Sequence, residues 1–276
     1  MISRAFITEW RRAAPWVEDA QVEQDLVISR SLVEIFSHSS VSENLAFRGG
    51  TALFKLHLPA ARYSEDIDLV QIVPGAIGPV LSALRSGLDG WLGRPKRDFS
   101  EGRVTLLYRF SSEGSPPTPL KLKIEINTRE HVALHGIEPR PFKVHSSWFT
   151  GEAMVPTFDL DELLATKLRA LYQRKKGRDA FDLWYALSNG RVLPERIVRA
   201  TLRYLGAEGH SVSRAEFEEN LFAKQADPRF RQDIGKLLVP GLTFDIDEAI
   251  AVIRDRLVAR FPGDEWKGTL TEPSQE

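Results

Sequence analysis

Polar and apolar side chains alternate in several segments of the first half of the chain. Ile67 and Leu69 alternate with Asp66 and Asp68, and two later segments show the same period of two. The apolar positions of those later segments are Val104, Leu106, Tyr108 and Phe110, and then Leu122, Ile124 and Ile126. This period is typical of strands with one buried face. It predicts three strands, the first of which carries both aspartates on one face.

A short apolar run at residues 44–48 ends in two glycines, and helix-forming residues follow them up to Pro59. This order predicts a strand, a tight turn and a helix. Helical spacing of apolar residues also appears at 22–36, and again at 74–92 with expected interruptions near Gly87 and Gly90.

After Pro156 helical patterns replace the alternating ones. The segments with helical patterns are 159–174, 178–188, 194–205, about 227–238 and 245–261. We therefore predict an α+β protein. Residues 1–155 would form a small mixed sheet with helices, and residues 156–276 a mostly helical C-terminal domain.

Composition excludes several kinds of site. The chain has no cysteine, so disulfide partners, thiolate nucleophiles and cysteine-bound zinc are ruled out. The histidines form no zinc motif, and no P-loop sequence occurs. No segment approaches the run of about 20 apolar residues that a membrane helix needs, so we expect a cytoplasmic protein. Because the net charge is −1, binding to nucleic acid would need a local basic patch.

Asp66 and Asp68 carry the first candidate chemistry. Two aspartates separated by one strand residue project the same way and offer the oxygen ligands that Mg²⁺ prefers. Glu125, on the third alternating segment, supplies another carboxylate. Such a trio can hold two ions about 4 Å apart, which suits phosphoryl or nucleotidyl transfer. The plain alternative is an acidic pair on a solvent-exposed strand.

The glycine turn before these aspartates suits a phosphate group. Glycines let the backbone approach a phosphate closely, and the threonine that follows them could add a hydroxyl contact. Ser64 shares the strand face of Asp66. The residues predicted to bind the nucleotide are Gly49, Gly50, Thr51, Ser64 and Arg48. The alternatives are a tight connection without a ligand, and an ion pair of Arg48 with Glu65 or Asp66.

Lys167 lies inside the apolar stripe of the predicted helix 159–174. A lysine there either snorkels to the rim of the stripe or has a ligand to bind. On the next helix Asp179 and Asp182 share one face. Asp179 suits the helix start or a pair with Arg178, whereas Asp182 has no such structural reason.

The densest basic run of the chain lies around the junction of these two helices. Its members are Arg169, Arg174, Lys175, Lys176 and Arg178. A run of this kind is either a solvated helix end or a track for a polyanion. We take it as the candidate RNA-binding surface.

Five stretches of the sequence resemble the AbiEii/AbiGii toxin family, which includes the MenT-type toxins of bacterial toxin–antitoxin systems. The stretches are 47–53, 62–69, 121–127, 161–171 and 178–185. The first two resemble its nucleotidyltransferase signature, the third its third-carboxylate strand, and the last two its helical lysine and aspartate motifs. By this resemblance Lys167 would reach the triphosphate, and Asp182 would complete the active site.

The resemblance implies a metal-dependent nucleotidyltransferase toxin with the nucleotidyltransferase fold. It would transfer a nucleoside monophosphate from a nucleoside triphosphate to RNA, with Mg²⁺ as cofactor and the 3′ end of tRNA as the expected acceptor. Translation and growth would stop unless a cognate antitoxin, encoded nearby, neutralised the enzyme. The predicted catalytic residues are Asp66, Asp68, Lys167 and Asp182, and the predicted metal ligands are Asp66, Asp68 and Glu125.

Other interpretations of the sequence stay open. The enzyme could modify a small molecule, as aminoglycoside nucleotidyltransferases do, although the basic run favours RNA. It could also be an idle nucleotide- or RNA-binding module, although the complete carboxylate trio argues against that. Phosphorylation of Ser64 would add about two negative charges beside the aspartates and obstruct the triphosphate. Mass spectrometry of protein co-expressed with its genetic neighbour tests this hypothesis, which an always unmodified Ser64 would contradict.

Overall fold

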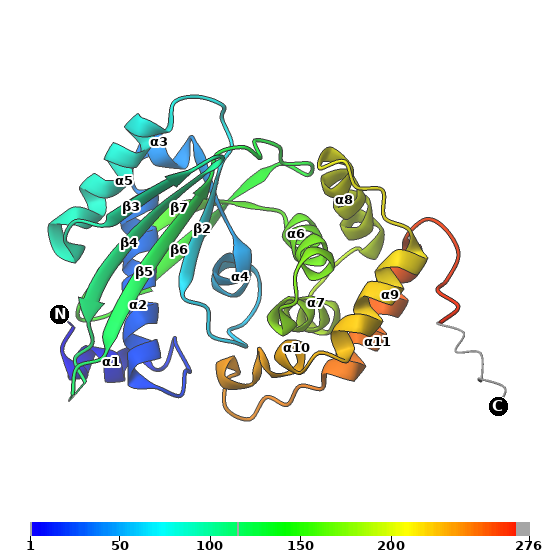
Figure 1. Cartoon of the computed structure of the whole chain (residues 1–276). Coiled ribbons are helices and arrows are strands. Elements are labelled where there is room, and N and C mark those ends of the chain that lie inside the picture. The colour runs from blue at the N-terminus through cyan, green and yellow to red at the C-terminus, as the bar shows by residue number, and fades with distance from the viewer. Residues whose placement is uncertain (1, 115, 269–276) are drawn as a thin grey trace. The chain divides into compact units, whose positions relative to one another are not determined.

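The computed structural model describes residues 2–114 and 116–268, and these form two compact units (Figure 1). The first, called the sheet unit here, comprises Met1–Asp159 together with Leu237–Leu242. The second, the helical unit, comprises Leu160–Lys236 and the described residues from Thr243 onward. In the described ranges no helix combines the length and the apolar character that crossing a membrane would take.

A mixed seven-stranded sheet forms the centre of the sheet unit. Its strands are β1 (Leu45–Arg48), β2 (Asp66–Gln71), β3 (Lys96–Ser100), β4 (Arg103–Ser111), β5 (Pro119–Asn127), β6 (Ile137–His145) and β7 (Thr150–Phe158). Their order is β3-β4-β5-β2-β1-β7-β6. The pairs β2–β5 and β1–β7 are parallel, and the other neighbours are antiparallel. The predicted mixed sheet is confirmed, with more strands than the alternation alone indicated.

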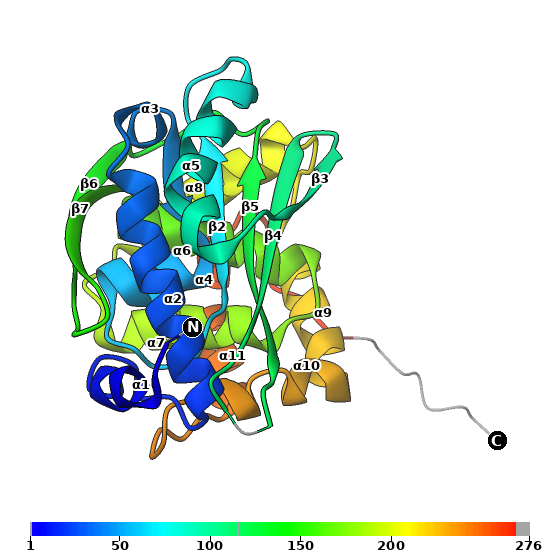
Figure 2. The same cartoon turned by 90° about the vertical axis from the view of Figure 1, so that its left-hand side faces the viewer.

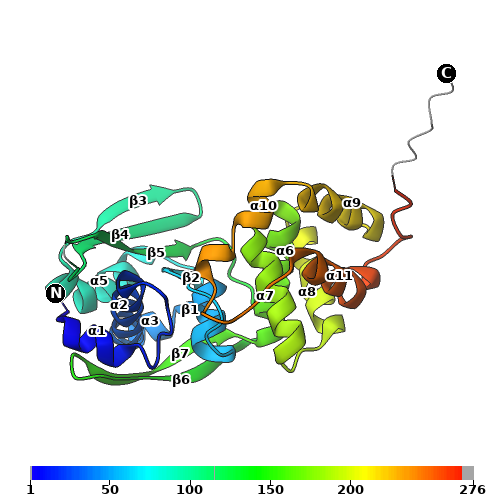
Figure 3. The same ribbon diagram turned by 90° about the horizontal axis from the view of Figure 1, so that it is seen from below.

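The sheet curves around the long helix α2 (Asp19–Phe36), which lies with α5 (Ile77–Leu92) between β3–β5 on one side and β6–β7 on the other (Figure 2 and Figure 3). Leu26 and Leu32 of α2 are fully buried, as are Ile67 of β2 and Ile124 of β5. Burial of such side chains stabilises the fold by about 1.5–3 kcal/mol each. The inner face of the sheet is therefore apolar, and the outer face holds the polar residues of each strand. Two short helices, α1 (Arg4–Trp10) and α3 (Ser39–Ser42), flank α2.

The helix after the glycine turn differs from the prediction in where it begins. It begins at the glycines themselves, as α4 (Gly49–Ala52), and continues as a π-helical turn, η1 (Leu53–His57). The predicted interruption of the helix at 74–92 is wrong, because α5 is continuous to Leu92. At Gly87 the carbonyl oxygen of Glu34 lies only 3.3 Å from where a Cβ would be. This glycine therefore lets α5 pack closely on α2, and it does not break the helix.

The helical unit is formed by a series of helices joined by short turns. They are α6 (Leu160–Gln173), α7 (Gly177–Asn189), α8 (Pro194–Ala207), α9 (Arg214–Gln225), α10 (Pro228–Gln232), α11 (Ile246–Arg256) and the 3₁₀ turn η3 (Val258–Arg260). The helix expected at about 227–238 is too long in the prediction. Only α10 and a 3₁₀ turn, η2 (Gly235–Leu237), form there. Backbone bonds explain the difference, since Leu237 accepts from Tyr63 at 2.7 Å and Val239 donates to Ala61 at 3.1 Å.

A pair of glycine substitutions tests the packing of the helical unit. A Cβ on Gly177 would lie 2.2 Å from the carbonyl oxygen of Phe230, whereas a Cβ on Gly206 would meet nothing within 4 Å. We expect Gly177→Ala to lower the free energy of unfolding by about 1–3 kcal/mol through overpacking. Gly206→Ala, on helix α8, should raise it by about 0.5–1 kcal/mol. Urea titration followed by circular dichroism measures both, and equal effects of the two changes would contradict the packing described here.

Candidate active site

The register between β2 and β5 brings three carboxylates to the outer face of the sheet. Asp68 lies opposite Glu125, and Asp66 lies opposite Lys123. The residues between them, such as Ile67, are fully buried on the inner face. Because side chains alternate along a strand, Asp66, Asp68 and Glu125 all project from the outer face. The structure thus brings together the carboxylates that the sequence pattern singled out.

A lysine that the sequence analysis did not consider lies among these carboxylates. The Nζ atom of Lys123 is 3.1 Å from Glu125 Oε2 and 3.6 Å from Asp66 Oδ2. Burial lowers the pKa of Lys123, but the charges of Asp66 and Glu125 and the hydrogen bond to Glu125 outweigh it and hold that pKa above its ordinary value. The lysine therefore stays protonated and offsets part of the negative charge. Its place follows from the parallel register, which no local pattern reveals.

The carboxylates on the outer face of the sheet are the candidate ligands for a metal ion. Across residues 2–114 and 116–268, no group of three or more His, Cys, Asp and Glu side chains has the arrangement of a metal site. Asp66 and Asp68 nevertheless offer hard oxygen donors on one face of one strand, which suits Mg²⁺. Glu125 is engaged by Lys123 at 3.1 Å, so a cation bound there would compete with the ammonium group.

Gly49 brings the turn into contact with the aspartates. Its φ of +82° is a conformation that side-chain-bearing residues rarely adopt, and an added Cβ would lie 2.2 Å from Asp68 Oδ2. Gly50 is similarly close to Arg62, with Nη2 2.3 Å from an added Cβ. The positive φ restricts the first position to glycine, whereas a side chain at Gly50 would have to displace the guanidinium group of Arg62. The backbone of the turn therefore packs directly against the carboxylate of Asp68.

The hydroxyl of Thr51 holds the start of β2. Thr51 Oγ1 donates to the carbonyl oxygen of Asp66 at 2.6 Å and lies 2.9 Å from Ser64 Oγ. Only 3% of Thr51 is exposed, so in this structure its hydroxyl positions Asp66 and is not directed to solvent. Arg48 pairs with Glu130 at 2.6 Å, which differs from the expected partners Glu65 and Asp66.

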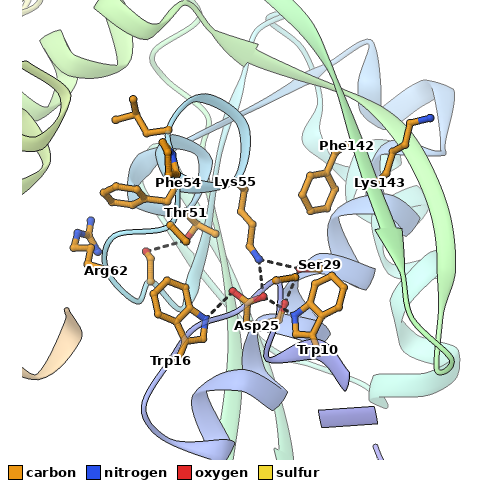
Figure 4. Close-up of a pocket in the computed structure, with 15 residues that line it drawn as sticks. Trp10, Trp16, Asp25, Ser29, Thr51, Phe54, Lys55, Arg62, Phe142 and Lys143 are labelled. Carbon is orange, nitrogen blue, oxygen red and sulfur yellow. Dashed lines mark hydrogen bonds and ion pairs between the residues drawn. The ribbon is translucent and has the colours of Figure 1, made fainter. Parts of the chain in front are cut away.

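A buried carboxylate, Asp25 of α2, supports the segment that follows the glycine turn (Figure 4). It accepts hydrogen bonds from the indole N–H of Trp10 at 2.8 Å and of Trp16 at 3.0 Å. Lys55 of η1 lies 2.7 Å from it, and both residues line a pocket of about 250 Å³. Asp25 is 1% exposed, and three donors compensate its charge. This network ties the N-terminal helices to the segment that follows the glycine turn.

In the helical unit, Lys167 sits in a buried cluster of charges. Its Nζ atom lies 2.8 Å from Asp182 Oδ2 and 3.3 Å from Asp179 Oδ1. Arg174 also binds Asp179, with contacts of 2.7 and 2.9 Å. Both aspartates are fully buried. The expected pair of Asp179 with Arg178 is wrong, because Asp179 contacts Lys167 and Arg174 instead.

The predicted RNA-binding run is also engaged in ion pairs within the helical unit. Its pairs are Arg169–Glu208 at 3.0 Å, Arg174–Asp179 at 2.7 Å, Lys175–Asp227 at 3.3 Å, Lys176–Asp233 at 3.6 Å and Arg178–Asp233 at 4.0 Å. Each basic residue of the run therefore has a carboxylate beside it. The sequence could not show this, because most of these partners lie far along the chain. The positive charge of the run is largely offset in this structure.

Comparisons with known proteins were made on sequence and on structure. Residues 30–252 match the family model described as nucleotidyl transferase AbiEii toxin, type IV TA system. No curated protein matches the chain in sequence.

Among solved structures, the chain is similar to MenT4, a nucleotidyltransferase toxin from Mycobacterium tuberculosis H37Rv. The TM-score is 0.69 at 18% identity, over 95% of this chain and 91% of MenT4. A putative nucleotidyltransferase from H. pylori is also similar, with a TM-score of 0.54 at 14% identity, over 87% of this chain and 94% of that one. At these identities the likeness shows a shared fold.

The family match covers most of the 276-residue chain and includes the glycine turn, the strand aspartates and the buried lysine cluster. The fold agrees with it, as an α+β nucleotidyltransferase fold with a helical C-terminal part. The chain therefore belongs to the AbiEii family of nucleotidyltransferase toxins of type IV toxin–antitoxin systems.

Proposed function

We propose that this enzyme transfers a nucleoside monophosphate from a nucleoside triphosphate to the 3′ hydroxyl of an RNA. The hydroxyl oxygen bonds to the α-phosphorus, the bond from that phosphorus to the β-phosphate bridging oxygen breaks, and pyrophosphate and a proton leave. The observation that carries this proposal is the contact of Gly49 with Asp68 on the outer sheet face. It puts a glycine backbone that can approach phosphate beside acidic metal ligands.

Asp66 and Asp68 are the residues that would hold Mg²⁺, which supplies charge stabilisation for the transferring phosphate when bound. Glu125, opposite Asp68 in the register, assists them. Lys123 keeps these carboxylates close together by offsetting their repulsion. Thr51 fixes the backbone at Asp66, so the direction of the carboxylate is set before substrate binds.

The nucleotide-binding residues proposed in the sheet unit are Gly49, Gly50, Thr51, Ser64 and Arg48. Gly49 and Gly50 contribute backbone that carries no side chain of its own, with Asp68 and Arg62 lying beside it. Arg48 would exchange its pair with Glu130 for a phosphate oxygen, as a guanidinium readily binds either group. Ser64, already within reach of Thr51, presents a hydroxyl at the start of the aspartate strand.

Lys167 is proposed to offset charge on the triphosphate, with Asp182 orienting its ammonium group. The 2.8 Å contact between them supports the orienting role. An ammonium group in a buried cluster interacts more strongly with developing negative charge than one in water does. The same contacts also have a structural effect, because removal of Lys167 would leave two buried carboxylates short of a partner.

The acceptor proposed is RNA, with the 3′ end of tRNA as the first case to examine, and the consequence is loss of translation and growth. An antitoxin encoded nearby is the proposed partner, which the family description supports. A small-molecule acceptor is the alternative. Labelled triphosphates incubated with Mg²⁺ and either total RNA or a panel of aminoglycosides separate the two, since label should appear in RNA alone.

The aspartates are tested by amide substitution. Asp68→Asn should reduce transfer of labelled nucleotide to RNA by about 100-fold or more, the scale of losing one strong electrostatic contact at a reacting phosphate. Glu152→Gln, on exposed positions of β7, is the matched control and should retain activity. Circular dichroism checks that both fold. An Asp68→Asn protein that is folded and fully active would contradict the proposed role.

The two roles of Lys167 are separated by a substitution that keeps its charge. Lys167→Arg preserves a cation for Asp179 and Asp182 but replaces a compact ammonium by a planar group. We expect a melting temperature within a few degrees of wild type and a fall in kcat of about tenfold or more. Lys175→Arg, the same change at an exposed lysine that pairs with Asp227, should change neither greatly. Unchanged kcat in Lys167→Arg would leave Lys167 a structural residue only.

A further inference from the structure

A second group of basic residues lies on the outer face of the sheet, on β5, which neighbours the aspartate strand β2, and on β4 beyond it. The side chains of Arg109 on β4 and Lys121 on β5 are exposed, and neither has an ion pair within 4 Å among the residues that the structure describes. This contrasts with the basic run of the helical unit, where each member has an acidic neighbour. Uncompensated positive charge in the sheet unit is therefore found here.

The strand register puts these two cations directly opposite each other. Arg109 pairs with Lys121 in the antiparallel β4–β5 ladder, and the buried neighbours Tyr108 and Leu122 face inward toward α2. Directly opposite side chains on an antiparallel pair have Cβ atoms about 4.5–5.5 Å apart, and like charges there destabilise the sheet. An anion that contacts both would turn this repulsion into attraction. The register therefore places two cations side by side on the outer face of the sheet.

The surface at this pair is hollowed. Arg109 and Lys121 line a depression of about 540 Å³ together with Ser111, Gln24, Phe110 and Glu65. Glu65 is the one carboxylate in that lining, so the depression has a net positive charge from its two cations. Glu65 also immediately precedes Asp66, so the depression adjoins the first residue of the aspartate strand.

The direction of β5 links the depression to the proposed reaction. Lys121 is two residues before Lys123, which lies opposite Asp66, and this step corresponds to about 6–7 Å along a strand. An RNA strand with its terminal hydroxyl near Asp66 would thus carry its preceding phosphates past Lys121 and Arg109.

We propose that Arg109 and Lys121 form a clamp for backbone phosphates of the acceptor RNA, next to its 3′ end. The inference rests on the proposed transfer to RNA and assigns acceptor binding to the sheet unit instead of to the basic run at 169–178. The clamp binds phosphate without reading bases, so it contributes affinity and direction but no sequence preference.

The test compares two double variants with the same change in net charge. Arg109→Gln with Lys121→Gln removes the clamp, and Arg12→Gln with Arg191→Gln removes two other exposed cations that also lack an ion pair within 4 Å among the described residues. Binding of a short fluorescent single-stranded RNA is measured by anisotropy over a range of salt concentrations. Loss of the clamp should weaken binding about tenfold or more. It should also reduce the slope of log K against log salt by about 1.4, from two lost contacts.

Other results would contradict the clamp or assign Arg109 and Lys121 to another role. Unchanged RNA affinity in the clamp variant, or an equal loss in the control, would overturn the proposal. So would a higher KM for the triphosphate with RNA binding intact, which would assign the pair to the nucleotide. Neutralising Lys175 and Lys176, which are exposed, should have little effect on RNA affinity, and a dominant loss there would restore the assignment of RNA binding to the basic run. Arg109→Lys should retain binding, because it keeps the charge.

RNA binding and transfer are separate measurements, so the clamp and the proposed function can fail independently. If wild type binds RNA through the clamp but labels no RNA with any triphosphate, the clamp stands and the transfer proposal fails. If RNA is labelled but the clamp variant binds and reacts like wild type, the transfer stands and the clamp fails. Thermal melting of the clamp variant checks folding, and its midpoint should not fall, since a like-charge pair has been removed.

Discussion

The close approach of Gly49 to Asp68 is the constraint on which the rest of the site depends. Because a Cβ at Gly49 would overlap Asp68 Oδ2, the turn and the aspartate can occupy their places only with glycine there. The parallel register of β2 and β5 then fixes Glu125 and Lys123 beside the aspartates. The contact of Gly49 with Asp68 and the pairing of β2 with β5 together produce one acidic surface, with Lys123 among its carboxylates.

Buried carboxylates stabilise the structure only where their charge is met by donors. Asp25 receives two indole N–H groups and the ammonium of Lys55, and Asp179 receives contacts from Lys167 and Arg174. A buried charge left without its partner costs about 3–5 kcal/mol. These networks therefore hold specific side chains in place, and the one around Asp25 fixes the segment that follows the glycine turn. Rigid support of this kind is what a preorganised active site requires.

The parts of the fold that could be predicted from sequence are those with a local signal. The alternation of polar and apolar residues predicts the strands that contain Asp66, Val104 and Leu122. The two adjacent glycines predict the turn. Strand β6 was missed because Pro139 and Pro141 suppress a strand signal, although prolines are tolerated on an edge strand. Strand β3 was missed because it is exposed throughout and has no apolar face.

The site shows the same division between local and long-range information. The orientation of the aspartates follows from their spacing, and the resemblance pointed to Lys167. Lys123 and the Arg109–Lys121 pair depend on register between strands, and the neutralised basic run depends on carboxylates far along the chain. From residue types alone, the basic run at 169–178 was the candidate RNA-binding surface. The ion pairs show why charge density along a sequence is a poor guide to charge on a surface.

The central claim is that the α-phosphate, with its nucleoside, is the group transferred. One reaction with RNA, Mg²⁺ and triphosphate labelled at the α position, run beside the same reaction labelled at the γ position, measures it directly. The account predicts label in RNA from the α position alone, with the γ label released as pyrophosphate. Label entering RNA from the γ position, or entering from neither with every triphosphate, would contradict it.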